Sequence, residues 1–417
     1  MNYEIKAELS KGLATLEIEG KKQRFESSDE NELRRMIVNR ASEYAVEVNA
    51  SFVILNTRDH EGEERFGVTA EGKIKPLPED EEKTEASAPK DESVEQTTSS
   101  NPATPAPTVA DFLTTAPPVA EGPAQEGWRG AIVQLTGMKL GPSKTELRHR
   151  EAKRQAQRSY GEPKTIVVLN PKGGTEKTTT VLSLGEAFGT LRGGSVLSWD
   201  VNETRGTLGW RAPLPGHDRT AVDLLNNLDQ FDGSGRVGDL DRYVRSQGDA
   251  QFDVLASDEQ PGGEFMIGGT EFNSLHSMLQ KFYRLIIVDT GNNMRASNWR
   301  AAVDKADLLV IVSPVREDAA ASAAWLIDGL RKMGYEDKIK NAVTVIRTPD
   351  AAVEKEKDKY KQLQRRLRGH FESLTREVIE VPYDKTLASG ERMNFAAVSK
   401  QTKESWLFVA EAISKGL

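Results

Sequence analysis

With 417 residues the chain has room for more than one domain, and its formal net charge of -8 at pH 7 argues against a nucleic-acid binder held by overall charge. The absence of cysteine excludes disulfides, thiol nucleophiles, cysteine-ligated zinc and iron–sulfur clusters. No apolar run has the length of a membrane span, and the N-terminus lacks an apolar signal core. We therefore expect a cytoplasmic protein that at most lies peripherally at the nucleoid or the inner membrane surface.

Residues 1–74 are predicted to form a small α+β module. Apolar and polar residues alternate around Leu16, which is typical of a half-buried strand. Apolar residues then recur at helical spacing between Leu33 and Val48, and Asp29 precedes that run as a helix start. Because no residue of the module suggests chemistry, we interpret it as a docking module for a protein partner.

Residues 75–126 are predicted to be a disordered linker. The segment is rich in Pro, Ala, Thr, Ser and Glu and includes the acidic run 79–82. Such a composition cannot bury enough apolar surface to offset the entropy lost on ordering. We therefore expect a tether between two folded parts.

Residues 127–163 are interpreted as a basic helical bridge. Trp128 and Leu135 could anchor it to the domain that follows. Its basic residues cluster between 148 and 158, and a charge run of this kind is usually a solvated helix face. The alternative is a contact with an anionic surface, either non-specific DNA or a membrane.

Residues 164–417 are predicted to form an α/β domain. Short β-branched runs alternate with helical stretches, a pattern that indicates βαβ crossovers and a mainly parallel sheet with helices on both faces. The candidate strands are 165–169, 195–199, 252–255, 284–289, 308–313, 342–346 and 378–381.

A glycine-rich loop joins the first of these strands to a helix. Glycines let main-chain amides point into one concavity, and the helix N-terminus adds its positive dipole end, so the loop is suited to phosphate. Lys177 would reach the β- and γ-phosphates, and the Thr178 hydroxyl would ligate Mg²⁺. The alternative is a structural turn with incidental lysines. The candidate nucleotide-binding residues are Gly173, Gly174, Thr175, Glu176, Lys177, Thr178 and Thr179.

The loop resembles the deviant Walker A motif of the ParA/MinD superfamily of P-loop ATPases, whose pattern is Lys-Gly-Gly-x-x-Lys-Ser/Thr. The resemblance implies ATP and Mg²⁺ as ligands. It also implies an ATP-dependent homodimer in which Lys172 reaches the nucleotide of the partner subunit. The sequence departs from the family at Glu176, where glycine is usual. A side chain there crowds the phosphates and adds a negative charge, so nucleotide affinity should be weakened.

A second motif follows the strand near residue 199. In the family this strand ends in Asp-x-Asp, and Asp200 matches the first acid. Asn202 stands where the resemblance expects the acid that positions or activates the attacking water. An amide can hydrogen-bond water but cannot take its proton. We therefore predict slow hydrolysis, with Lys172, Asp200 and Asn202 as the catalytic candidates.

A third motif, residues 283–293, resembles the Walker B segment. Asp289 ends a buried strand at the place where Mg²⁺ and its waters would lie. A plain capping aspartate is the alternative. Residues 346–350 lack the family's adenine-reading asparagine, so no base contact is assigned there, and Tyr383 is a candidate to pack near the base. The apolar C-terminal helix lacks the basic face of a lipid binder, so we expect it to pack on the domain.

Two functions fit these observations. The first is a slowly hydrolysing ATP-dependent dimerisation switch that positions DNA or a cell-envelope or secretion machine, as the resemblance implies. Segments around Trp128 and 141–143 resemble actinobacterial MinD-like ATPases, some of them linked to type VII secretion. The second is a non-hydrolysing, nucleotide-bound scaffold whose N-terminal module binds a protein partner.

Overall fold

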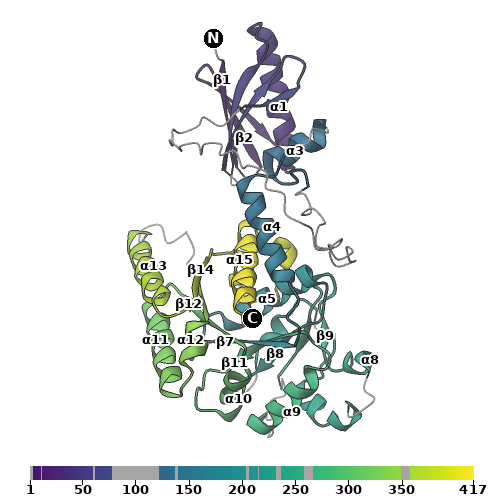
Figure 1. Cartoon of the computed structure of the whole chain (residues 1–417), viewed down its shortest axis with the longest axis vertical. Helices are drawn as coiled ribbons and strands as arrows, with labels where there is room; N and C mark the ends of the chain where they lie inside the picture. Colours follow the sequence, from purple (N-terminus) through teal and green to yellow (C-terminus); the bar gives the residue numbers. More distant parts are fainter. Residues whose placement is uncertain are drawn as a thin grey trace, which may run out of the picture. The chain divides into compact units, whose positions relative to one another are not determined.

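The computed structural model divides the chain into two compact units, Met1–Arg148 and His149–Leu417 (Figure 1). Each unit has its own apolar core. The residues that the structure describes are 3–10, 12–59, 62–77, 122–136, 140–202, 206–214, 216–231, 236–257, 266–348 and 357–417.

The N-terminal unit is a six-stranded sheet covered on one face by helix α1 (Glu30–Glu47), so the predicted α+β module is confirmed. Asp29 caps this helix by accepting a hydrogen bond from the Asn31 amide at 2.9 Å. Strands β1 and β4 pair in parallel, and the other neighbours are antiparallel. The sheet order is β3-β2-β1-β4-β5-β6, with β1 (Glu4–Ser10), β2 (Leu13–Ile18), β3 (Lys21–Glu26), β4 (Val53–Asp59), β5 (Gly62–Val68) and β6 (Ile74–Pro76).

Helix α3 (Gly127–Thr136) corrects the expectation for Trp128. This side chain is 3% exposed and belongs to the core of the N-terminal unit, with the Arg34 guanidinium 5.8 Å from its ring. Arg129 forms an ion pair with Glu64 of β5 at 3.0 Å. The indole therefore joins the core beside α1 and does not serve as an anchor for the next domain. The side chain of Leu135 and residues 78–121 of the predicted linker lie outside the described residues, and the boundaries at 74, 126 and 163 stay predictions.

Helix α4 (Lys144–Gln157) carries most of the basic segment 148–158. Ala152 and Ala156 are fully buried, while Arg154 pairs with Glu151 at 2.9 Å. Arg158, just after the helix, lies 5.7 Å from the Tyr160 ring. The helix thus has one packed face and one charged face.

The C-terminal unit is an eight-stranded sheet in which every neighbouring pair is parallel except β9 and β10. This confirms the predicted mainly parallel α/β fold. The order is β14-β13-β12-β7-β11-β8-β10-β9, with β7 (Lys164–Leu169), β8 (Val196–Val201), β9 (Arg245–Ser246), β10 (Asp253–Leu255), β11 (Leu285–Thr290), β12 (Leu308–Pro314), β13 (Val343–Arg347) and β14 (Glu377–Val381).

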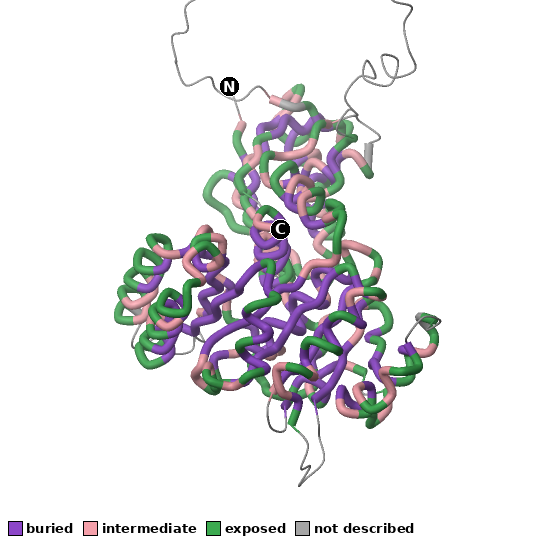
Figure 2. The backbone as a smooth tube through the Cα atoms, turned by 60° about the horizontal axis from the view of Figure 1, so that its bottom comes forward, coloured by how far each residue is buried: buried purple, intermediate pink, exposed green. Residues whose placement is uncertain are grey.

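Helices cover both faces of this sheet because successive β7 residues point to opposite sides. Ile166 and Val168 enter one core, and Val167 and Leu169 enter the other. The first core includes α5 (Lys177–Arg192) and α15 (Lys400–Gly416), which lie side by side. The second includes α7 (Ala221–Leu225), α8 (Val237–Leu240), α9 (Gly269–Leu279), α10 (Ser297–Lys305), α11 (Glu317–Lys332), α12 (Glu336–Lys340) and α13 (Lys357–Glu372). Figure 2 shows the buried strands in purple between these layers.

The C-terminal helix packs on the domain, as expected. In α15 the side chains of Trp406, Val409, Ala410 and Ile413 are buried in the core that also contains α5. Among the described residues no helix combines the length and apolar character that crossing a membrane requires. The remaining short elements are α6 (Leu208–Arg211), α14 (Lys385–Ala388) and the 3₁₀ turns at Leu228–Phe231, Gly248–Ala250 and Phe395–Ala397.

The order of the strands places the glycine-rich loop at the centre of the sheet. β7 lies between β12 and β11. The next strand along the chain, β8, lies on the β11 side, whereas β12, β13 and β14 lie on the other side. In open parallel sheets, ligands bind at this point, beyond the carboxyl ends of the strands. The ends of β7, β8 and β11 all contribute residues there.

Candidate functional site

The site is a pocket of about 440 Å³ beyond the carboxyl ends of the central strands. One wall is the loop 173–179, which contains all seven predicted nucleotide-binding residues. The structure therefore brings these residues together with Asp289 and Asn202, which the sequence predicted separately. The other lining residues are Gly206, Thr207, Arg211, Thr290, Asn292, Leu387, Ala388 and Gly390.

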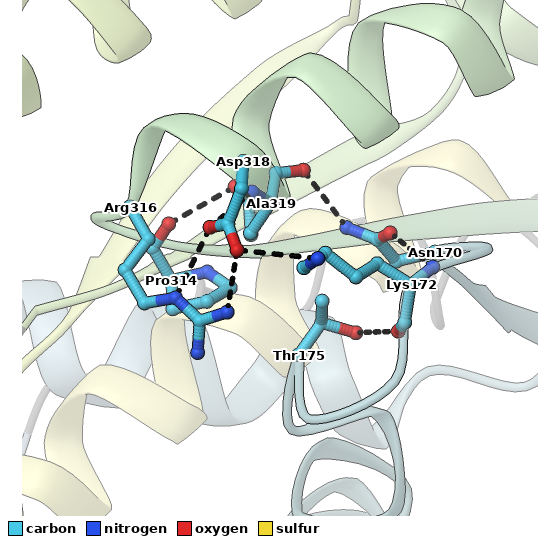
Figure 3. A network of polar contacts seen from close by, with 8 residues as sticks. Asn170, Lys172, Thr175, Pro314, Arg316, Asp318 and Ala319 are labelled. Carbon is cyan, nitrogen blue, oxygen red and sulfur yellow. Dashed lines mark hydrogen bonds and ion pairs between the residues drawn. The ribbon is translucent and has the colours of Figure 1, made fainter.

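Hydrogen bonds to its neighbours hold the loop in shape (Figure 3). The Asn170 amide nitrogen donates to the Val312 carbonyl at 2.8 Å, and its oxygen accepts from the Lys172 amide at 2.9 Å. The Thr175 hydroxyl donates to the Lys172 carbonyl at 3.1 Å. Gly174 has a positive φ of 70°, a conformation that glycine adopts without strain. Hydrogen bonds within the chain thus hold the bend in place.

Lys177, Thr178 and Asp289 converge inside the pocket. The Lys177 ammonium donates to the Asn292 side-chain oxygen at 2.7 Å and to the Lys172 carbonyl at 3.3 Å. The Thr178 hydroxyl donates to Asp289 Oδ2 at 2.6 Å. Asp289 Oδ1 is buried and has no hydrogen-bond partner among the described residues. A hydroxyl beside an unsatisfied buried carboxylate is a donor set that fits Mg²⁺.

Two buried acids lie next to each other at the pocket, and their environment shifts their pKa values. Asp200 and Asp289 are register partners on the adjacent strands β8 and β11. Burial raises the pKa of both carboxyls, and burial together with the nearby charge of Asp200 raises the pKa of Asp289 to about 7. Burial also lowers the pKa of the Lys177 ammonium. A cation bound at Asp289 would lower the pKa of this carboxyl again, because an opposite charge favours the ionised carboxylate.

Asp200 organises the chain that follows β8. Its Oδ1 accepts hydrogen bonds from the Asn202 side chain at 2.7 Å and the Asn202 amide at 3.1 Å. Its Oδ2 accepts from the Leu208 amide at 3.2 Å. A Cβ at Gly206 would overlap the Asp200 carboxylate, so only glycine fits there. Asn202 lines the pocket with its amide, and neither of its oxygen or nitrogen atoms can act as a general base.

Lys172 lies apart from the residues that line the pocket. Its ammonium pairs with Asp318 Oδ2 at 3.2 Å, and Arg316 holds the same carboxylate at 2.9 Å (Figure 3). The Arg316 and Lys172 hydrogen bonds hold the pKa of Asp318 well below its usual range. Both side chains of the Lys172–Asp318 pair are partly exposed, at 37% and 51%. The Lys172 ammonium is therefore accessible and pairs outside the pocket lining, while the main-chain carbonyl of Lys172 accepts from Lys177.

Glu176 has a left-handed backbone conformation that glycine adopts more readily. Its φ is 67°, in the left-handed region, which costs a side-chain-bearing residue about 1 kcal/mol or more. Its carboxylate turns to Arg347 of β13, whose Nε donates at 2.8 Å. Arg347 is 3% exposed and also lies 5.5 Å from the Trp406 ring. The loop therefore stays open, because the extra side chain is held by a buried arginine.

Replacing Glu176 by glycine should destabilise the ligand-free chain, although it removes the left-handed strain. The strain is about 1 kcal/mol, whereas a buried cation left without its partner costs about 3 kcal/mol. We expect the free energy of unfolding, measured with denaturant, to fall by about 1–2 kcal/mol. This figure is discounted for solvent screening, because the Glu176 side chain is 33% exposed. Adding Arg347→Met to Glu176→Gly should restore most of the lost stability. If Glu176→Gly were as stable as wild type or more stable, the ion pair would not stabilise the chain.

Several site residues were given no role from the sequence, although Asn292 lies within the third motif, residues 283–293. Asn292 and Arg211 contact Lys177 and Thr179 from distant segments, at 2.7 and 2.6 Å. Residues 387–390 close another wall of the pocket. Tyr383, the candidate for base packing, is 36% exposed and does not line the pocket. Pro349 and Asp350, from the segment where a base contact was sought, lie outside the described residues.

The C-terminal unit has a mainly parallel sheet with helices on both faces, and a glycine-rich loop joins its central strand to a helix. These features define it as a P-loop-type α/β fold. No protein-family model matches the chain. The ESX-1 secretion-associated protein EspI of Mycobacterium tuberculosis, in strains CDC 1551 and H37Rv, is 27% identical over 302 residues. The match covers 70% of this chain and 42% of EspI, so the chain spans less than half of these curated relatives.

Two solved structures similar to this chain are ParA- and MinD-type ATPases. The ParA family ATPase of Chlorobium tepidum is 18% identical with a TM-score of 0.47, and the alignment covers 60% of this chain and 98% of that one. The cell division ATPase MinD of Pyrococcus furiosus is 18% identical with a TM-score of 0.45, at the same coverage.

Proposed function

We propose that the C-terminal unit binds ATP with Mg²⁺ and works as a nucleotide-dependent dimerisation switch of the ParA/MinD type. One observation carries this proposal: Lys177, Thr178 and Asp289 come from two motifs 111 residues apart and meet in one pocket walled by the glycine-rich loop. A structural turn would not need a buried lysine and an unsatisfied buried carboxylate at the same place.

Each part of the pocket then has a role. Main-chain amides of the loop and the Lys177 ammonium bind phosphate oxygens, for which the N-terminus of α5 adds a favourable dipole. Thr178 and Asp289 would hold Mg²⁺, which when bound offsets the negative charge of the phosphates. Lys172, which is accessible and lies outside the pocket lining, is left to reach the nucleotide of a second subunit.

Hydrolysis in this site is slow. Asn202 presents an amide where a carboxylate would position or activate water, and its nitrogen is committed to Asp200 at 2.7 Å. Without a proton acceptor at that point, general-base assistance is lost. The ATP-bound dimer should therefore be long-lived, which suits a switch that waits for an activating partner.

Of the two possible targets, a secretion machine of the cell envelope fits the comparisons better than DNA. The relative EspI is described as associated with ESX-1 secretion, and it is similar over 70% of this chain. The N-terminal unit would supply the contact with a protein partner. A contact of the segment 148–158 with DNA or an inner membrane surface remains a further part of the proposal.

A non-hydrolysing scaffold is the second candidate, and two observations favour it. Asn202 removes the acid, and Glu176 places a side chain in a left-handed loop position. Both changes weaken turnover while leaving the pocket open. In that case the bound nucleotide would stabilise the fold, and the N-terminal unit would be the working part.

The size of the protein in solution separates these candidates. We expect the full chain to be monomeric with ADP and dimeric with ATP and Mg²⁺ when measured by light scattering. Lys172→Ala should bind ATP and stay monomeric. A wild-type chain that binds ATP and remains monomeric would contradict the switch and favour the scaffold.

A further inference from the structure

Arg211 enters the candidate site from an element that no motif predicts. It ends the short helix α6, and its guanidinium lines the pocket beside the loop. One terminal nitrogen donates to the Thr179 hydroxyl at 2.6 Å, and the other donates to the Leu387 carbonyl at 3.1 Å. Thr179 directly follows the Lys-Thr pair of the loop, so the arginine lies on the wall to which phosphate would bind.

The guanidinium has hydrogen-bonding capacity to spare. Arg211 Nε is buried and has no hydrogen-bond partner among the described residues. Burial lowers the pKa of this side chain, and the charges of Glu176 and Asp289 act in the opposite direction. A buried donor left unsatisfied costs free energy, and an oxyanion in the pocket would recover it. The arginine therefore has a donor left over that suits an oxyanion.

Contacts on both sides fix the position of α6. The Leu208 amide at its start donates to Asp200 Oδ2 at 3.2 Å, and the Gly206 amide donates to the Ser257 hydroxyl at 3.0 Å. At the other end the Met393 amide donates to the Arg211 carbonyl at 2.9 Å. Little reorganisation is needed before the arginine can act, and preorganised donors bind more strongly than mobile ones.

The acidic side chains around the pocket explain why a second cation would help to bind phosphate. Asp200, Asp289 and Glu176 are carboxylates at or beside the phosphate-binding wall, and Glu176 is an addition to the expected motif. Arg347 neutralises Glu176 from outside the pocket lining. Inside the pocket, Lys177 and Arg211 are the two cationic side chains among the residues that line it. Both cations favour the binding of a polyphosphate beside these acids.

We propose that Arg211 is a phosphate-binding residue of this site, a second cationic side chain beside Lys177. This inference rests on the proposed nucleotide-binding function and adds a residue to it. Arg211 contacts Thr179, which follows the Lys-Thr pair at the start of α5, and the Leu387 carbonyl on another wall of the pocket. We assign it to phosphates that ADP and ATP share.

Calorimetric titration of the full chain with ADP and with ATP tests this assignment. Charge-assisted hydrogen bonds of this kind correspond to a loss of about tenfold to a hundredfold in affinity when the charged partner is removed. We expect Arg211→Gln to lose that factor for both nucleotides, and to the same extent with and without Mg²⁺. Arg211→Lys keeps the charge and should recover part of the loss. Arg331→Gln, which removes an exposed arginine that is ion-paired on α11, is the matched control and should bind like wild type.

Thermal unfolding without nucleotide checks that Arg211→Gln is folded, and Arg211→Lys provides the comparison if it is not. If wild type binds nucleotide and Arg211→Gln binds it equally well, the arginine has no such role. A loss confined to ATP would also overturn the assignment, because it would place the arginine at the γ-phosphate. If wild type binds neither nucleotide, the proposed function itself fails, and this inference fails with it.

Discussion

Lys177→Ala should weaken the binding of both ADP and ATP by about a hundredfold, because it removes the one buried lysine of the pocket. The ammonium donates to the Asn292 and Lys172 oxygens, two neutral acceptors that a phosphate would readily displace. Calorimetric titration with Mg-ADP and Mg-ATP measures the change directly. The truncation leaves Thr178 and Asp289 in place, so residual weak binding through the metal is compatible with the account.

Lys172→Ala is the matched control, since it removes another lysine of the same loop. Its ammonium pairs with Asp318 and does not line the pocket, so affinity for ADP should change by less than about threefold. The assignment of Lys177 would be wrong if both variants bound nucleotide like wild type. Equal losses in both would mean that the loop as a whole had been disturbed.

Asn202→Asp should raise the rate of ATP hydrolysis by about a hundredfold. General-base assistance contributes a factor on the order of 10²–10⁴, and the wild-type amide cannot supply it. The new carboxylate would lie beside Asp200, whose Oδ1 is 2.7 Å from the present amide nitrogen. That repulsion should lower the stability of the ligand-free chain, and Mg²⁺ should offset it in part.

Phosphate release under saturating Mg-ATP is the appropriate measurement, with Asn202→Ser as the control that introduces no acid. Wild type and the serine variant should both be slow. If wild type, alone or with its activating partner, turned ATP over as fast as Asn202→Asp, the amide would not be what limits hydrolysis. The scaffold alternative would then lose one of its two supports.

The fold of the C-terminal unit was largely predictable because its strands are fully buried. Residues 166–169 are all apolar, and such runs between helical stretches indicate a parallel sheet. The strand at Arg245–Ser246 has no such pattern and was not predicted. The order of the strands also could not be read from the sequence, since crossovers do not fix which strands become neighbours.

The site was predictable where it is local in the sequence. The glycine-rich loop is contiguous, so its chemistry shows in one segment, and Asp289 follows a recognisable strand. Arg211 was missed because its role depends on contacts across the fold. Glu176 and the segment 346–350 were noticed separately, as two departures from the expected motifs, and the structure shows that Glu176 and Arg347 form an ion pair. Trp128 was misassigned because burial alone does not say which core a tryptophan joins.

Hydrogen exchange of the backbone amides in residues 170–180, with and without saturating Mg-ADP, tests the central claim most directly. The account places phosphate oxygens on these amides, so exchange in this segment should slow on nucleotide binding, while exchange in the sheet of the N-terminal unit stays unchanged. Nucleotide bound at saturation with no protection of residues 170–180 would contradict it, because the ligand would then be held somewhere else.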